Sequence, residues 1–292
     1  MSATNAFPQI SARRRRTDKV MRASLLAATI VALIPLILII YYLIHKGLSA
    51  WTQSGFFTTH PTGSFFGSPG GIRSAILGSL EIVALATLIS IPIGIGVALY
   101  LTEYGKQSWF ANTVRYFVDV MTGVPSIMFG LFIYIVLVIG RFGGSGFAGW
   151  KGAVALALLM LPIVIRSSEV VLLLVPSSLR EAALALGAPR WRVVFQVVLP
   201  TSATGLLTGS LLAIARGMGE TAPLLFTVST AFALTYDLNA QMNTMPFLIY
   251  TDITSPRAAI QTIAWGTALT LVVIVLILNL VARLIASRSR MA

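Results

Sequence analysis

The sequence contains no cysteine, so it offers no disulfide framework, no thiolate nucleophile and no cysteine-ligated metal site. Histidine is almost as scarce, because His45 and His60 are the only two and neither has a second ligand at metal-binding spacing. The chain also lacks a Gly-x-x-x-x-Gly-Lys-Ser/Thr phosphate loop, so we expect it not to hydrolyse ATP itself. We therefore expect no catalytic residues, no metal site and no cofactor in this chain.

Charged residues are few, and acidic ones are the rarer kind. Only 10% of the 292 residues are charged, with 9 Asp and Glu against 21 Lys and Arg, whereas 57% are hydrophobic and the mean hydropathy is +0.88. So much apolar surface cannot be buried in one water-soluble core, so we expect an all-α integral membrane protein surrounded by lipid. The net charge of +12 could suggest a nucleic-acid partner, but the placement of the charges argues against one.

Six stretches are apolar and long enough to cross a bilayer, for which a helix needs about 20 residues. A polar segment of residues 176–200, here called the elbow, lies between the fourth and fifth of them. Residues 223–257 are apolar only in short runs, and we expect a re-entrant or surface-lying segment there. The six expected spans are 23–44, 72–100, 114–139, 152–175, 202–222 and 260–286.

The basic residues divide unevenly between the two ends of these spans. With both termini in the cytoplasm, fourteen of the 21 Lys and Arg lie on the cytoplasmic side of the membrane and five on the external side. The other two, Arg166 and Arg216, lie within spans. The positive-inside rule therefore favours this orientation, and it makes Arg13 to Arg16 a topology anchor rather than a nucleic-acid-binding tail. The expected parts are a cytoplasmic tail (1–22), a first span with its external loop (23–71), a core of five spans (72–287) and a cytoplasmic tail (288–292).

The elbow has the composition of two short helices joined at an angle. Ser178 and Glu181 have the spacing of a capping box, and strong helix formers follow them. Gly187 should end the first helix, and Pro189 suits the first turn of a second helix that runs to Pro200. An amphipathic connector lying on the membrane surface would also have this pattern, so periodicity alone does not establish a docking element.

The elbow also carries a recognisable motif, a Glu-Ala-Ala triplet followed by glycine and then Leu-Pro, at Glu181, Ala182, Ala183, Gly187, Leu199 and Pro200. This motif resembles the signature loop of ABC importer permeases. The stretch from Leu161 to Gly187 and the block Arg-Gly-Met-Gly-Glu-Thr-Ala-Pro, from Arg216 to Pro223, resemble the phosphate-specific branch, PstA type. The resemblance covers roughly residue 72 onward. It implies a type I ABC importer permease fold in a bacterial inner membrane, with six transmembrane helices and a cytoplasmic coupling-helix loop.

The resemblance also implies partners. A sister permease of PstC type would pair with this chain, two ATPase subunits of PstB type would bind ATP and Mg, and a PstS-type external protein would deliver inorganic phosphate. The elbow would fit a groove in the ATPase and transmit its opening and closing. The residues implied in that contact are Glu181, Ala182, Ala183 and Gly187, with Arg190 and Arg192 as flanking charges.

Two charged residues, Arg216 and Glu220, belong to the fifth span. Small residues recur there every four positions, at Gly205, Gly209, Ala213 and Gly217, which permits close approach of another helix. On a helical wheel both charges fall within this stripe, so we expect them to face protein or a pathway. Arg216 is the candidate phosphate contact, because its fork of donors stays protonated when desolvated. A purely structural ion pair with Glu220 is the alternative.

Three further residues have weaker assignments. Arg166 shares a face with Glu169, and it suits an inner step of the anion path as well as an anchor between this span and the elbow. Thr221 could donate a hydrogen bond to an oxyanion, although hydroxyls in membrane helices commonly bond backbone carbonyls. Asp119 could pair with an arginine or line a subunit interface.

Other functions remain to be weighed against phosphate import. A permease for sulfate or molybdate would need the same arginine chemistry, and a passive anion channel would account for Arg216 but not for the elbow. An intramembrane hydrolase is disfavoured, because both histidines lie outside the expected spans and the sequence has no Gly-x-Ser-x-Gly nucleophile motif.

Overall fold

The computed structural model describes residues 11–62, 67–140, 144, 146–231 and 233–288, and these residues are almost entirely helical. No β-strand occurs among them, although Pro61 and Gly70 form an isolated bridge. The all-α expectation is therefore confirmed. Residues 1–10 of the expected N-terminal tail, most of the C-terminal tail and Arg141, which was counted as external, lie outside the described residues.

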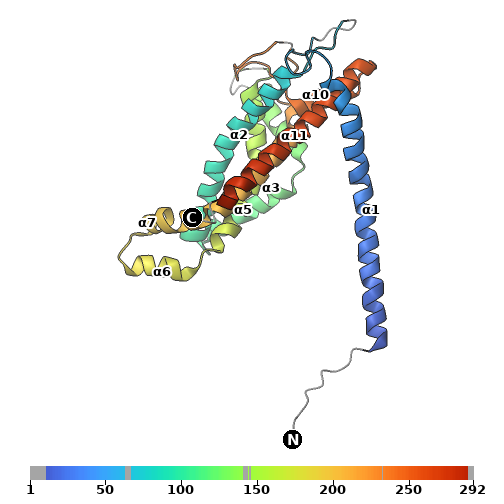
Figure 1. The fold of residues 1–292 in the computed structure, drawn as a ribbon. Coiled ribbons are helices and arrows are strands. Elements are labelled where there is room, and N and C mark those ends of the chain that lie inside the picture. Colours follow the sequence, from blue (N-terminus) through green and yellow to red (C-terminus); the bar gives the residue numbers. More distant parts are fainter. Residues whose placement is uncertain (1–10, 63–66, 141–143, 145, 232, 289–292) are drawn as a thin grey trace.

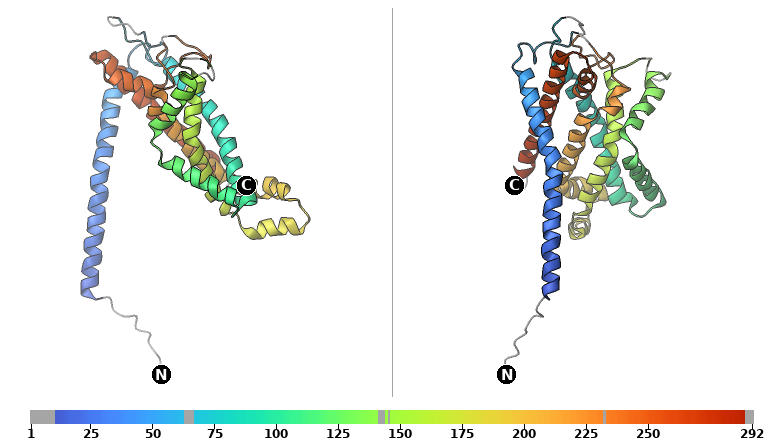
Figure 2. Two further views of the ribbon diagram at one scale, coloured as in Figure 1. Left: turned by 180° about the vertical axis from the view of Figure 1, so that it is seen from behind. Right: turned by 90° about the vertical axis from the view of Figure 1, so that its right-hand side faces the viewer.

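The first helix, α1 (Ala12–Trp51), has 40 residues and extends beyond the expected span of 23–44 at both ends. Its side chains are exposed along most of its length, and Figure 1 and the left view of Figure 2 show it standing apart from the other helices. Contact with α11 is confined to its C-terminal part. There Trp51 Nε1 donates a hydrogen bond to Thr270 Oγ1 at 3.0 Å, and a Cβ on Gly47 would lie 2.7 Å from Leu269 Cβ.

The bundle is built around α2 (Arg73–Leu99) and α5 (Gly149–Leu173), which pack along each other. Gly94 permits their close approach, since a Cβ there would lie 2.6 Å from Val164 Cγ1. Two further long helices, α8 (Leu199–Gly219) and α11 (Ala258–Arg288), complete the bundle, and a π-helical turn, η1 (Tyr100–Gly105), closes α2. Among the described residues, five helices are long and apolar enough to span a membrane, or six if one bent pair counts as a span.

The bent pair corrects the third expected span, which is not one continuous helix over 114–139. Helix α3 (Trp109–Gly123) stops, and α4 (Ser126–Ile133) continues at 102° to it before ending in the π-helical turn η2 (Tyr134–Val138). The physical cause is Pro125, which offers no backbone N–H and forces extended backbone on Val124, whose φ is −72° and ψ is 130°.

The segment between α8 and α11 packs into the bundle through its two short helices, whereas residues 233–241 between them are largely open. It contains α9 (Ala222–Leu225) and α10 (Met245–Ile253), joined by residues without regular structure. Leu224 and Met245 belong to the buried core. The Asn243 side chain donates to Ser74 Oγ at 3.1 Å and accepts from the Ala231 N–H at 2.9 Å, which ties this segment to the start of α2.

The elbow protrudes from the end of the bundle opposite α10, as Figure 1 shows. It consists of α6 (Ser177–Ala185) and α7 (Arg190–Val193), and the π-helical turn η3 (Val194–Val198) joins α7 directly to α8. The second elbow helix therefore does not end at Pro200 as expected. Pro200 is the second residue of α8, directly after η3, and the helical run passes through it.

Candidate anion site and elbow

The small-residue stripe of α8 packs against α5, as its spacing predicts. A Cβ on Gly205 would lie 2.5 Å from Val171 Cγ1, one on Gly209 would lie 2.5 Å from Ser167 Oγ, and one on Gly217 would lie 2.9 Å from Met160 Sδ. These distances leave no room for a larger side chain. The stripe therefore determines how closely α8 and α5 approach.

Arg216 and Glu220 form an ion pair near the far end of α8, with Arg216 Nη2 3.3 Å from Glu220 Oε1. The helix ends at Gly219, and Glu220 follows it with extended backbone. The Arg216 side chain is 58% exposed and the Glu220 side chain is 14% exposed, so the two do not share one packed face as the helical wheel suggested. Arg216 lies beside the stripe, where its charge also suits the negative end of the α8 dipole.

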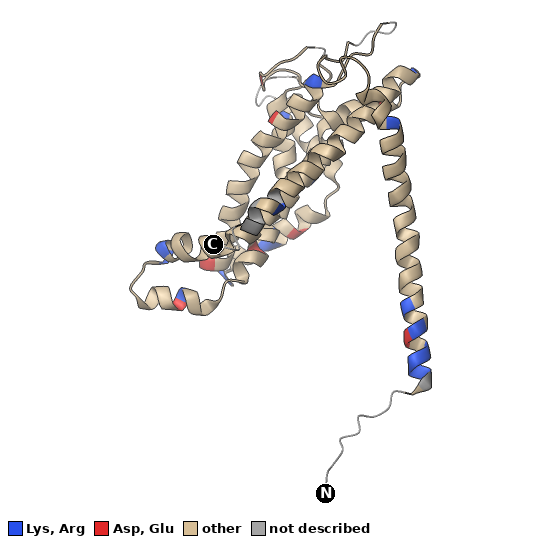
Figure 3. Ribbon diagram, in the orientation of Figure 1, with Lys and Arg blue, Asp and Glu red and all other residues tan. Residues whose placement is uncertain are grey.

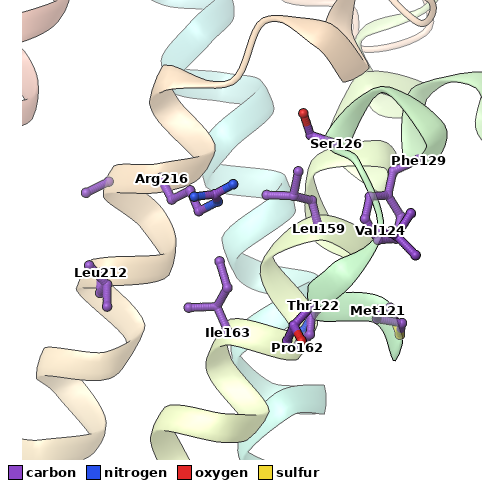
Figure 4. Close-up of a pocket in the computed structure, with 11 residues that line it drawn as sticks. Met121, Thr122, Val124, Ser126, Phe129, Leu159, Pro162, Ile163, Leu212 and Arg216 are labelled. Atoms are coloured by element: carbon purple, nitrogen blue, oxygen red, sulfur yellow. The ribbon is translucent and has the colours of Figure 1, made fainter. Parts of the chain in front are cut away.

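The Arg216 side chain lines a cavity of about 600 Å³ enclosed by the α3–α4 break, α5 and α8. Figure 4 shows its guanidinium pointing away from α8 toward the side where Ser126 and Thr122 lie. The bend at Pro125 brings the first turn of α4 to this cavity, and helix N-termini favour anions. Most of the lining is apolar, and Arg216 is its one formally charged residue. The residues that line the cavity are Met121, Thr122, Val124, Ser126, Phe129, Leu159, Pro162, Ile163, Leu212, Ala215 and Arg216.

Arg166 does not line this cavity. Since Gly209 faces Ser167 across the helix pair, Arg166 lies about 9 Å along α8 from the level of Arg216. Arg166 Nη1 donates to Glu169 Oε2 at 2.8 Å, and its guanidinium also pairs with Asp119 on α3. The structure thus separates the two candidate arginines. The expected anchor between this span and the elbow is wrong, because the partners of Arg166 belong to α3 and α5, whereas the expected pairing of Asp119 with an arginine is confirmed.

A second arginine, Arg115, completes this group. Its Nε donates to Glu169 Oε1 at 2.6 Å, and its Nη2 donates to the Leu101 carbonyl at 2.9 Å. Two arginines and two carboxylates therefore join α3 to α5 and to the end of α2. Thr221 is half-buried between α8 and α9 and is not among the residues that line the cavity.

Gly187 ends the first elbow helix, as expected. Its φ of 81° is in the left-handed region, and the hydrogen bonds from Gly187 N to Leu184 O (2.9 Å) and from Ala188 N to Ala183 O (3.2 Å) complete a Schellman motif. The expected capping box is wrong. Pro176 is the N-cap of α6, so Ser178 lies inside the helix and makes no capping bond.

The residues expected at the tip of the elbow are mostly open to solvent. Glu181, Ala182, Gly187, Arg190 and Arg192 are exposed. Ala183 is half-buried and packs on an apolar cluster that ties the elbow to the bundle, formed by Ala98, Leu172, Val175, Val193, Val198 and Leu206.

Sequence reasoning missed one elbow residue, Arg180, which pairs with Glu103 at the end of α2. The two lie 77 residues apart, and no local pattern in either segment indicates the other.

Comparison with known proteins identifies relatives over most of the chain. Residues 90–291 match the family described as "Binding-protein-dependent transport system inner membrane component". The phosphate transport system permease protein PstA of Yersinia pestis is 40% identical over 277 residues, covering 95% of this chain and 92% of that protein. PstA 1 of Mycobacterium tuberculosis (strain ATCC 25618 / H37Rv) is 38% identical over 290 residues, covering 97% and 93%.

Solved structures resemble this chain at lower identity. A chain of the bacterial alginate ABC transporter in complex with an alginate-bound periplasmic protein has a TM-score of 0.65 at 15% identity, covering 94% of this chain and 96% of that one. A chain of the inward-facing MetNI methionine ABC transporter has a TM-score of 0.61 at 19% identity, covering 75% and 97%. Identities this low concern the fold alone, and they confirm the importer permease fold expected from the sequence.

Proposed function

Because this chain belongs to the PstA family of phosphate transport system permeases, we propose that it is a membrane subunit of an ATP-driven importer of inorganic phosphate. The structural observation that best supports an oxyanion substrate is Arg216, the single formal charge on an otherwise mostly apolar cavity. Among the oxyanions, phosphate is supported by the relatives, which are phosphate transport permeases. A guanidinium fork attracts a tetrahedral oxyanion and donates to two of its oxygens at once. Glu220 holds that guanidinium and competes with the anion, which keeps binding reversible.

The remaining candidates of the anion path have supporting roles in this proposal. The ion pairs of Arg166 support a role in anchoring α3 beside the cavity, at the inner step of the path, more than direct contact with the anion. Thr221 follows Glu220 directly as the N-cap of α9, and its side chain makes no capping bond there, so its hydroxyl is proposed as a second donor to the anion where the path leaves α8.

We assign the elbow to the cytoplasmic side, together with both termini. The start of α1 and the end of α11 lie on the elbow side of the molecule in Figure 1. Figure 3 shows charged residues gathered around the elbow and at the start of α1, whereas the middle of the long helices carries almost none. An excess of Lys and Arg on one side is typical of the cytoplasmic face of a bacterial inner-membrane protein.

The proposed assembly follows from this orientation. A sister permease of PstC type would complete the path, a PstB-type ATPase dimer with ATP and Mg would receive the elbow, and a PstS-type protein would deliver phosphate at the opposite end. The exposure of Glu181, Ala182, Gly187, Arg190 and Arg192 supports their part in the ATPase contact, and half-buried Ala183 supports the elbow from within.

Uptake by proteoliposomes tests this function. The complete four-component complex should accumulate labelled phosphate only when ATP is enclosed with the ATPase, and excess sulfate or molybdate should not compete. Uptake that persists without the ATPase would show a passive channel. Competition by sulfate or molybdate at concentrations similar to phosphate would show a permease for another oxyanion.

A further inference from the structure

The start of α6 is tied to the end of α2 by one arginine. Arg180 Nε and Nη2 both donate to Glu103 Oε1, at 3.0 and 2.9 Å, and Glu103 lies in η1. The two side chains are only 21% and 11% exposed. The same guanidinium donates to the carbonyls of Val175 at 2.6 Å and Leu172 at 2.8 Å, at the end of α5. Arg180 therefore joins three segments at one point.

The pair connects two parts of the molecule that the chain itself does not connect. The elbow continues directly into α8 through η3, and a short link of residues 174–176 joins it to α5. Helix α2 has no such covalent link to the elbow. The elbow contacts this end of the molecule through the apolar cluster that includes Ala98 of α2, and through the ion pair of Arg180 with Glu103.

A cavity of about 170 Å³ lies beside the pair. Glu103 and Tyr104 line it from η1 and Lys106 from the residue directly after η1, while the elbow contributes the rest of the lining. Close packing therefore does not hold α6 against η1 at this place, and the Arg180–Glu103 pair is a polar contact between them. The ion pair beside this cavity is mostly buried and therefore weakly screened by salt, and a guanidinium held by three acceptors has a defined orientation.

We propose that Arg180 and Glu103 are positioning residues that carry movement of the elbow to α2, so that α2 moves together with α8. This inference rests on the proposed coupling of the elbow to an ATPase. In a purely structural role Arg180 would only cap the carbonyls at the end of α5, and Glu103 would then be dispensable.

Glu103→Gln separates the two roles, because it removes the charge of the pair and leaves Arg180 and its carbonyl contacts in place. In the reconstituted complex we expect phosphate transported per ATP hydrolysed to fall by roughly two- to thirtyfold while ATP hydrolysis continues. Glu103→Asp, which keeps the charge at shorter reach, should restore part of the ratio. The matched control is Asp18→Asn, which breaks an exposed Asp–Arg pair on α1 and should leave the ratio unchanged. A native ratio in Glu103→Gln would overturn the inference.

A distance measurement tests the inference without reference to phosphate. Since the chain has no native cysteine, spin labels at Leu88→Cys on α2 and Leu186→Cys on the elbow report a single distance. ATP binding should leave this distance unchanged in the otherwise native complex and change it in the Glu103→Gln background. An equal change in both would overturn the inference. Failure of phosphate uptake in the native complex would instead count against the proposed function alone.

Discussion

Arg166 and Glu169 lie one turn apart on α5, and their 2.8 Å ion pair is completed from a second helix. The other carboxylate oxygen of Glu169 accepts from Arg115 Nε at 2.6 Å, and Asp119 pairs with Arg166. The Glu169 side chain is 7% exposed, whereas that of Asp119 is 62% exposed. Glu169 is therefore the buried centre of the group, and Asp119 is its solvent-facing member.

Removing the charge of Glu169 should destabilise the protein far more than removing that of Asp119. Glu169→Gln leaves two guanidiniums without a buried counter-charge, which typically costs about 3–5 kcal/mol. Asp119→Asn alters an exposed pair, worth about 1 kcal/mol or less. Thermal unfolding in detergent checks this order, and equal losses in the two variants would show that Glu169 is not the centre of the group.

Arg216→Lys should transport phosphate more slowly than the native chain, and Arg216→Gln should transport almost none. Lysine keeps the charge but loses the planar fork that binds two oxygens together. Initial uptake rates at saturating ATP measure the effect, with binding of the ATPase as the control for correct assembly. A native rate in Arg216→Lys would refute a fork-specific role.

Gly187→Val should impair both ATPase binding and transport, whereas Gly187→Asn should be tolerated. No atom lies within 4 Å of a Cβ placed at this position, so the cost arises from the φ of 81° and not from a clash. Left-handed backbone costs most residues roughly 1–2 kcal/mol, and asparagine adopts it more readily. Pull-down of the ATPase distinguishes the variants. Equal behaviour of valine and asparagine would show that the shape of the elbow is not what matters.

Gly209→Ala should destabilise the α5–α8 pair, and Gly96→Ala should not destabilise its own helix. A Cβ at position 209 would lie 2.7 Å from Ser167 Cβ, so the two helices must separate, at a typical cost of about 1–3 kcal/mol. At Gly96, in α2, nothing lies within 4 Å, and alanine there favours the helix by roughly 0.5–1 kcal/mol. Thermal unfolding of the two variants in the same detergent compares them, and stability losses of similar size would contradict the packing argument.

Asp252→Asn should remove a pH dependence of stability. Burial raises the pKa of Asp252 from 3.8 to about 6, although a hydrogen bond from Thr251 opposes the rise. The folded state therefore binds a proton that the unfolded state releases, and this contribution to stability is lost as pH rises from about 4 to about 6. The melting temperature of the asparagine variant should exceed that of the native chain above this range and approach it below. A constant difference at every pH would argue against titration of Asp252.

Features that depend on neighbours along the chain followed directly from the sequence. Gly187 ends α6 because only a residue that accepts left-handed backbone can close a Schellman motif there. The glycines of α8 oppose α5 because residues four apart share a helix face. The break in the third span was harder to predict, since continuous hydropathy concealed the effect of Pro125 on the helix.

Features that depend on register between distant helices could not be predicted. Arg180 meets Glu103 and Arg115 meets Glu169 across separations of 77 and 54 residues, and the charges themselves do not specify which pairs form. Proline kinks such as Pro125 and Pro162 predict a cavity, but its place at Arg216 could not be predicted, because it depends on the α3–α4 bend facing α8.

In the proposed coupling, α8 acts as a lever, because η3 joins it directly to the elbow. Figure 1 shows α7 lying at an angle to the long helices, so the straight arm is α8 itself, in which Arg216 lies about 26 Å along the axis from Leu199. Over that arm, a tilt of about 5° displaces the guanidinium by about 2 Å. Under this proposal, a small rotation at the elbow moves Arg216 from bonding distance of an oxygen to beyond it.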